Sequence, residues 1–381
     1  MTAQDSAHPE THRRGRSIPA FVCAGVAAVV VLAVPFAARH LDGTADEFST
    51  RTMPILPALG WAVVAVLAAV VITHRVQIWF HVDEGAVLAT TYDVLPLLLL
   101  LAPLIAVVAF ISDHLLLAAG GAALALYLPV LVVPRFRSSE VPTWAASAPR
   151  FKLAVANVFV DNPTPQKAAD QLVACGADVI VIAEATPDFM SHFDAAGGDS
   201  AYPHRVTDPD DCSDYAVAIV AREPLGDNSR VVTSGELHLA LAEVTVAGLM
   251  TTVIAINPMS SFDPDGQEIW KQQICALKEF VPTIPGPLVI AGDFNSTRFR
   301  PQFEDLLEAG DLKDAIDTLG QSWRPSFSLS SVWPLGALGA IVRLDQALTN
   351  DQVCSLHVHN MNACGSDHIP FTITFAVRPP Q

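Results

Sequence analysis

The segment 288–295, LVIAGDFN, ends an apolar stretch with two polar side chains that could carry chemistry, Asp293 and Asn295. In an extended chain, residues two apart lie on the same face. Far downstream, the segment 365–368, GSDH, places a carboxylate next to an imidazole at Asp367 and His368. A carboxylate that can hold a metal or a water, an amide and an orientable histidine are the groups that metal-assisted hydrolysis needs.

Three further polar residues stand near the ends of strand-like segments: Asn157, Glu184 and Asp345. A sandwich of sheets gathers the loops at its strand ends into a site. We therefore expect these side chains to lie near Asp293 and His368.

The part of the chain from residue 150 to 378 predicts many strands and few helices, because its apolar residues mostly form short runs. The expected strands are 151–160, 177–182, 216–220, 239–246, 251–256, the segment ending at Asp293, 340–348 and 371–377, and the expected helices are 166–174 and 267–280. This pattern is typical of an α+β domain, most simply two packed sheets with flanking helices.

Four apolar stretches without Lys, Arg, Asp or Glu precede this domain: residues 18–38, 54–73, 94–111 and 115–133. Each has roughly the length that a bilayer core requires, about 20 residues. We predict an all-α transmembrane anchor of about four helices over residues 1–134, a linker over 135–149 and a separate domain over 150–378.

A cleaved signal peptide is the alternative for the first stretch, because arginines precede it. Its length and the spans that follow favour an uncleaved helix. With four spans, the basic residues on one side of the membrane are Arg13, Arg14, Arg16, Arg75, Arg135 and Arg137, and those on the other are Arg39 and Arg51. This distribution predicts an integral membrane protein with both termini in the cytoplasm. If one stretch does not cross, the domain is exterior.

The chain is acidic, with a formal net charge of −17, and most of the excess lies in the second domain. From Arg135 onward there are 16 Lys and Arg against 30 Asp and Glu. Such a surface repels a phosphate backbone, so long duplex DNA is disfavoured as a substrate. Phosphoester chemistry itself is not excluded, because a bound metal can still attract a phosphate.

At these residues the chain resembles the endonuclease/exonuclease/phosphatase superfamily, whose members share a deoxyribonuclease-like fold. The resemblance covers about residues 150–378 and is closest to a membrane-anchored bacterial branch. It rests on the order of an Asn on the first strand (Asn157), DVIVIAE (Glu184), GDFN (Asp293, Asn295), an LD pair (Asp345) and SDH (Asp367, His368). It implies a four-layer β-sandwich and phosphoester hydrolysis by metal-activated water.

The resemblance also implies roles for the residues. Glu184 is similar to the main ligand of a Mg²⁺ or Mn²⁺ ion, with Asn157 beside it and Asp367 nearby. Asp293 resembles the residue that orients or deprotonates water, and Asn295 the one that holds the phosphoryl group. His368, oriented by Asp345, looks like the imidazole that binds or protonates phosphoryl oxygens.

The sequence departs from the family pattern at Asn257, where members usually carry a histidine. Asparagine can donate a hydrogen bond to phosphate but cannot carry a proton. Two hypotheses follow. The first is a membrane-anchored hydrolase acting on a small phosphodiester, a lipid headgroup or a nucleic acid. The second is a catalytically weakened member that acts as a phosphate-ligand binding or scaffold protein.

Overall fold

The computed structural model describes residues 55–82, 85–208, 211, 213–261, 264–328 and 339–379. The chain divides into two compact units, residues 1–83 and residues 84–381. The predicted span at 18–38 and the arginines before it lie outside the described residues.

In the first unit, the described helix is α2 (Ile55–Phe80). Its part from Pro57 to Phe80 is long and apolar enough to cross a bilayer. The predicted span at 54–73 lies almost entirely within this helix.

The second unit begins with apolar helices: α3 (Ala86–Asp93), α4 (Leu95–Leu99), α5 (Leu101–Ile111), α6 (Leu115–Ala125) and α7 (Tyr127–Val132). Residues Leu115–Phe136 form a second candidate span. The segment Ala86–Asp93 meets the segment Leu95–Ile111 at a bend of 68°. The two segments count as a third candidate span only if they are taken together as one broken crossing. The described residues thus contain two candidate spans, or three with the bent pair.

The segment 133–149 holds two short 3-10 helices, η1 (Val133–Phe136) and η2 (Thr143–Ala146). The backbone N–H of Ser139 donates to the carbonyl of Thr318 at 2.7 Å. Ala145 and Ala148 are buried against Ala376. The chain is therefore packed on the following domain well before its first strand.

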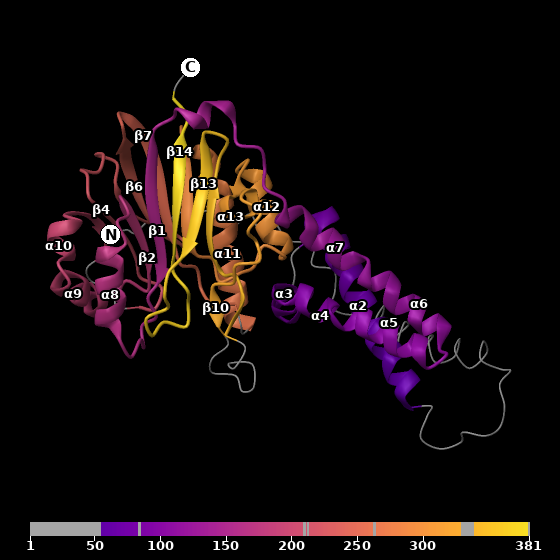
Figure 1. Ribbon diagram of the computed structural model, residues 1–381. Helices are drawn as coiled ribbons and strands as arrows, with labels where there is room; N and C mark the ends of the chain where they lie inside the picture. Colours follow the sequence, from indigo (N-terminus) through magenta and orange to yellow (C-terminus); the bar gives the residue numbers. More distant parts are fainter. Residues whose placement is uncertain are drawn as a thin grey trace, which may run out of the picture. The chain divides into compact units, whose positions relative to one another are not determined.

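Two mixed six-stranded sheets face each other in this domain (Figure 1). The first sheet has the order β13 (Val353–Asn360), β14 (Phe371–Val377), β1 (Arg150–Asn157), β2 (Val179–Ala183), β4 (Val217–Ala221) and β3 (His204–Thr207). The second has the order β5 (Arg230–Ser234), β6 (Leu237–Val246), β7 (Leu249–Ile256), β8 (Leu288–Asp293), β12 (Asp345–Thr349) and β9 (Lys313–Asp314). A separate two-stranded ribbon joins β10 (Phe327–Ser328) to β11 (Ala340–Val342).

Helices cover the outer faces of both sheets. Their bounds are α8 (Pro165–Ala174), α9 (Pro187–Ala195), α10 (Gly198–Ala201), α11 (Pro264–Phe280), η3 (Val281–Thr283) and α12 (Pro301–Ala309). The short helix α13 (Ala315–Thr318) instead packs Ala315 and Ile316 into the core between the sheets. Three buried apolar clusters separate the layers. One fills the space between the sheets, one lies under α8 and α9, and one lies under α11 and α12. The predicted four-layer sandwich after apolar helices is confirmed.

Strand direction brings the candidate residues to one end of the sandwich. β1 runs parallel to β2, so that Asn157 is paired with Ala183 at the end of both strands. β12 runs antiparallel to β8, and the first residue of β12, Asp345, is paired with Asp293. Because side chains alternate along a strand, the residues two before Asn157 and Asp293, Val155 and Ala291, belong to the core between the sheets. The polar side chains therefore close the end of that core.

Gly292 fits a position that other residues could not occupy. Its φ is +139°, a conformation that favours glycine, and an added Cβ would lie 2.0 Å from the carbonyl oxygen of Ile256 on β7. The close approach of β7 and β8 just before Asp293 depends on the missing side chain.

Gly292→Ala should destabilise the full chain by roughly 2–3 kcal/mol more than Gly286→Ala, because a Cβ overpacks the strand pair. Gly286 precedes the same strand, also has positive φ, +80°, and has open space around it. The pair of variants therefore separates the collision from the backbone strain. Thermal melting in detergent measures the difference, and equal melting temperatures for the two variants would contradict the argument.

Candidate functional site

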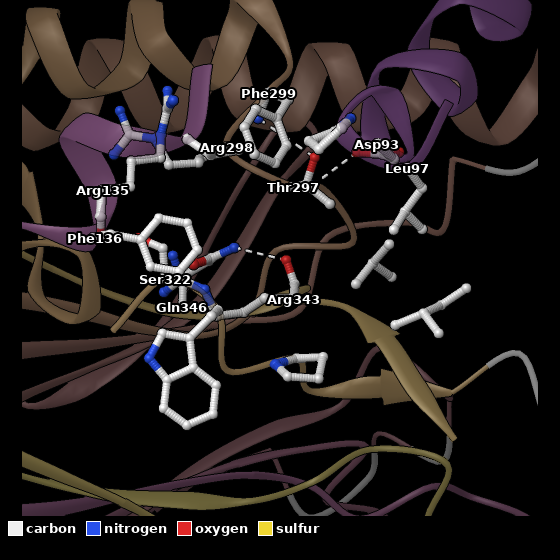
Figure 2. Close-up of a pocket in the computed structure, with 16 residues that line it drawn as sticks. Asp93, Leu97, Arg135, Phe136, Thr297, Arg298, Phe299, Ser322, Arg343 and Gln346 are labelled. Atoms are coloured by element: carbon white, nitrogen blue, oxygen red, sulfur yellow. Dashed lines mark hydrogen bonds between the residues drawn. The ribbon is translucent and has the colours of Figure 1, made fainter. Parts of the chain in front are cut away.

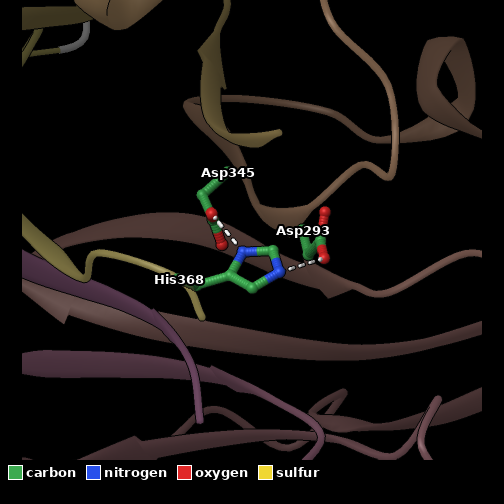
Figure 3. Close-up of side chains that lie close together, drawn as sticks. All are labelled: Asp293, Asp345 and His368. Atoms are coloured by element: carbon green, nitrogen blue, oxygen red, sulfur yellow. Dashed lines mark hydrogen bonds and ion pairs between the residues drawn. The ribbon is translucent and has the colours of Figure 1, made fainter. Parts of the chain in front are cut away.

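Asp293, Asp345 and His368 form a buried cluster at the end of the sandwich (Figure 3). His368 Nδ1 lies 2.7 Å from Asp345 Oδ2, and Nε2 lies 3.6 Å from Asp293 Oδ2. The imidazole thus stands between two carboxylates that come from neighbouring strands of the second sheet.

The carboxylates determine the protonation of the imidazole. Burial alone lowers the pKa of His368, but the charges of Asp345 and Asp293 outweigh burial and raise this pKa to about 10. Burial raises the pKa of Asp293 to about 6, while the charge of His368 opposes this rise and Asp345 adds to it. At neutral pH the cluster therefore holds an imidazolium beside an ionised Asp293.

Asn157 connects this cluster to the first sheet. Its Nδ2 donates to Asp293 Oδ2 at 3.0 Å, and its Oδ1 accepts the N–H of Phe159 at 3.0 Å. Glu184, just beyond β2, accepts the N–H of Val160 at 2.6 Å. Burial raises the pKa of Glu184 to about 7, although the hydrogen bonds from Val160 and Asn157 lower it. The charges of Asp293 and His368 also act on Glu184, so both sheets contribute to one site.

The site has buried carboxylate oxygens that lack hydrogen-bond partners. Asp345 Oδ1 and Asp367 Oδ1 are such atoms, and Asp367 Oδ1 lies 3.9 Å from His368 Nε2. Burial also raises the pKa of Asp367. Since a buried carboxylate oxygen without a hydrogen-bond donor is costly, these two oxygens fit a site that receives a cation.

The cluster itself brings ligand atoms of Asp293, Asp345 and His368 within 4.8 Å of one another, close enough for one metal ion. A protonated imidazole, however, has no free lone pair for a metal. The raised pKa of His368 favours a hydrogen-bonded triad at these three residues. Glu184, Asn157 and Asp367 remain as the oxygen donors beside it.

The structure corrects one detail of the expected geometry, because Asp293 and Asn295 do not share an extended segment. β8 ends at Asp293, and Asn295 has a φ of +47°. Asp293 Oδ1 instead accepts the N–H of Asn295 at 2.7 Å, and Asn295 Nδ2 donates to the carbonyl of Pro258 at 2.9 Å. A turn directly after the strand, with a local carboxylate acceptor, replaces the continuous strand.

The parallel strands β7 and β8 pair Ile256 with Gly292. Asn257 and Asp293 are the next residues of the two strands, so the register places them at the same end of the sheet. It is buried, and its Nδ2 donates to the carbonyl of Asp214 at 2.8 Å. The amide that replaces the expected histidine is thus held by a neighbouring loop.

Three supporting residues were not predicted from the sequence. Ser326 Oγ accepts the N–H of Asp345 at 3.0 Å, and the ring of Phe327 lies 4.9 Å from the His368 ring. Ser366 Oγ donates to the carbonyl of Asn157 and accepts the N–H of His368. Ser366 belongs to the GSDH motif, whereas Ser326 and Phe327, which begins β10, lie far upstream in a segment without a motif.

A separate cavity of about 260 Å³ lies on the other face of β12, between that strand and the ends of α4 and α7 (Figure 2). Gln346 lines this cavity, while its neighbour Asp345 faces the site, because consecutive strand residues point to opposite faces. Arg135, Arg298 and Arg343 also line it, and each is paired with a carboxylate among Glu304, Asp314 and Asp317. The cavity is therefore distinct from the acidic cluster.

A sequence model described as the endonuclease/exonuclease/phosphatase family matches residues 154–368. The match spans more than half of the chain and includes the candidate residues from Asn157 to His368. The chain belongs to this family. A comparison with curated protein sequences finds no match.

Solved structures with a similar fold include several proteins of low identity. A D. rerio TDP2 with 14 humanizing mutations is 17% identical, with a TM-score of 0.49 over 60% of this chain and 99% of its own. Sphingomyelinase C from Streptomyces griseocarneus is 16% identical, with a TM-score of 0.44 over 59% and 99%. A mutant beta toxin from Staphylococcus aureus with bound magnesium ions is 19% identical, with a TM-score of 0.43 over 58% and 98%.

Mg²⁺ should bind the full chain roughly tenfold more weakly at pH 6 than at pH 8, because a metal requires the ionised carboxylate and protons compete for Glu184 below a pKa of about 7. Titration calorimetry in detergent at both pH values measures this ratio. Glu184→Gln should weaken binding and flatten its pH dependence, whereas Glu279→Gln, on the exposed side of α11, should change neither. Equal Mg²⁺ affinity of the wild type at pH 6 and pH 8 would refute the role of Glu184 as a metal ligand.

Proposed function

We propose that this chain is a membrane-anchored, divalent-metal-dependent phosphoester hydrolase that uses an activated water. Membership of the endonuclease/exonuclease/phosphatase family supports the reaction class. The observation that carries the proposal is the buried site itself, in which four carboxylates and one imidazole converge from both sheets.

Glu184 and Asn157 are the residues we assign to the metal, with Asp367 close to it. Carboxylate and amide oxygens suit a hard cation, Mg²⁺ or Mn²⁺. The unpartnered buried oxygens of Asp345 and Asp367 support a positive charge at this place. When bound, such an ion polarises a phosphoryl oxygen and acidifies a water.

The remaining residues have complementary proton chemistry. Asp293 is ionised above a pKa of about 6 and can accept a proton from the attacking water. His368 keeps its proton at neutral pH and can donate a hydrogen bond to phosphoryl oxygens, while Asp345 orients it. Asn295, held next to Asp293, is assigned to the phosphoryl group or the developing oxyanion.

The apolar helices support a membrane location, and we retain the anchor over residues 1–134 and the cytoplasmic orientation as part of the proposal. The substrate is a phosphoester: a small phosphodiester, a lipid headgroup or a nucleic acid presents the same reacting group. The net charge of −17 disfavours long duplex DNA among these.

Asp293→Asn should lower the Mg²⁺-dependent hydrolysis of bis-p-nitrophenyl phosphate by about 10²–10⁴-fold, because the amide cannot accept the proton of the water. Steady-state rates of the full chain in detergent test this. Asp351→Asn makes the same change at an exposed turn between β12 and β13 and should keep the wild-type rate. If Asp293→Asn and wild type hydrolyse the ester equally fast, the hydrolase proposal fails.

A second candidate function is a catalytically weakened phosphate-ligand binding or scaffold protein, and Asn257 is the observation that favours it. Its buried amide is committed to the carbonyl of Asp214 and has no acid–base capacity. In that case the fold and the ion would hold a phosphate without fast turnover.

Asn257→His should raise the hydrolysis rate by about tenfold or more, because an imidazole restores a group that can carry a proton beside Asp293. Asn257→Gln enlarges the side chain without adding acid–base chemistry and serves as the control. The measurement is the same phosphodiesterase assay across pH 6–9. No increase with histidine, or an equal increase with glutamine, counts against the assigned role of this position.

A further inference from the structure

Asp93 is a carboxylate at an unusual place. It is the last residue of α3, where the apolar helical path bends by 68° before α4 and α5. It is 8% exposed. A buried charge in an apolar helical segment is costly unless a partner compensates it, and such residues commonly serve a function.

The partners of Asp93 lie in the loop 294–300, which follows Asp293 at the end of β8 and which we call the catalytic loop. Asp93 Oδ1 accepts the backbone N–H of Thr297 at 2.8 Å, a contact drawn in Figure 2. Both carboxylate oxygens also accept hydrogen bonds from Arg300, at 3.0 Å and 2.9 Å from Nε, and a further bond comes from Nη2. The Asp93 carboxylate therefore binds both the backbone amide of Thr297 and the Nε and Nη2 groups of Arg300.

Arg300 transmits this contact to the helix on the outer face of the second sheet. Its Nη2 donates to Ser261 Oγ at 2.5 Å, and its Nη1 donates to Gln267 Oε1 at 3.1 Å. The guanidinium carbon lies 4.6 Å from the centre of the Trp270 ring. Arg300 is 1% exposed, so these contacts together satisfy a charge without help from solvent.

The same residues hold the backbone beside Asp293. Trp270 Nε1 donates to the carbonyl of Phe294 at 2.8 Å, and Ser261 Oγ donates to the carbonyl of Asn295 at 3.2 Å. These two bonds and the bond from the Thr297 N–H to Asp93 therefore fix the loop at Phe294, Asn295 and Thr297. Asn295 has a φ of +47°, in the left-handed region that asparagine adopts more readily than most residues, and these contacts hold that turn.

We propose that Asp93 is a positioning residue for the catalytic loop, so that the bent apolar helices α3–α5 form part of the hydrolase rather than only its anchor. The proposal rests on the proposed function for its catalytic consequence. Asp93 acts through Thr297 and Arg300, and it does not touch the reacting groups.

The experiment compares Asp93→Asn with Asp113→Asn in the full chain in detergent. Asp113 lies at the exposed turn between α5 and α6, so its variant makes the same change in the same helical segment away from the loop. Asp93→Asn should lower kcat for bis-p-nitrophenyl phosphate on the order of tenfold to hundredfold, because small displacements of catalytic groups have effects of this size. Its Mg²⁺ affinity should stay within about threefold, since Asn157 ends β1 and Glu184 follows β2, both strands of the other sheet. Asp93→Glu should recover part of kcat.

A second variant separates positioning from stability. Asp93→Leu with Arg300→Met removes both buried charges, so it should recover the melting temperature lost in Asp93→Asn without recovering kcat. Recovery of kcat together with the melting temperature would overturn the proposal, because Asp93 would then be a stability residue alone. Wild-type kcat in Asp93→Asn, or an equal loss in Asp113→Asn, would overturn it as well.

Hydrogen exchange keeps this test independent of turnover. The Thr297 amide should exchange about tenfold or more faster in Asp93→Asn than in wild type, with no change in Asp113→Asn. If wild type does not hydrolyse the ester but this difference is seen, the proposed function fails while the support of the loop by Asp93 stands. An unchanged Thr297 exchange rate shows that Asp93 does not hold the loop.

Discussion

Negative charge is concentrated at one end of the sandwich, where the two sheets face each other, and the arrangement of the site depends on how this charge is compensated. Glu184, Asp293, Asp345 and Asp367 share a largely water-excluded space with one imidazole. Burial, together with a smaller repulsion between the carboxylates, raises the pKa of Asp293 and of Glu184, and the charges of Asp345 and Asp293 raise the pKa of His368. The fold tolerates this arrangement because the strands and turns around it are fixed by many hydrogen bonds. A cation bound among these carboxylates would relieve the repulsion between them.

Much of the fold follows from patterns visible in the sequence. Fully apolar runs such as 179–183 became buried strands, and the amphipathic segment 267–280 became most of α11. The weaker elements were missed, because β3, β5 and β9 are short or half exposed and carry little periodicity. The helices α9 and α12 were also missed, although a proline opens each of them.

The sequence predicted which polar residues would lie close together, but not the geometry of their contacts. Polar residues at strand ends gave Asn157, Glu184 and Asp345, since one topology brings all such ends together. The turn at Asn295 could not be derived from a two-residue period that assumed an extended chain. Asp93 and Arg300 were also missed, because their pairing joins positions 207 residues apart and has no local motif.

Asn157 and Asp293 belong to different sheets, and a bond of 3.0 Å joins them across the interior. The distance between the sheets is set by the side chains that fill this interior, among them Val155, Ala255 and Ala291. A bulkier residue at such a position would push the two sheets apart and separate the residues that we assign to the ion from those that we assign to the attacking water. Under the proposed function, the volume of these apolar side chains therefore sets the alignment of the site as well as the stability of the core.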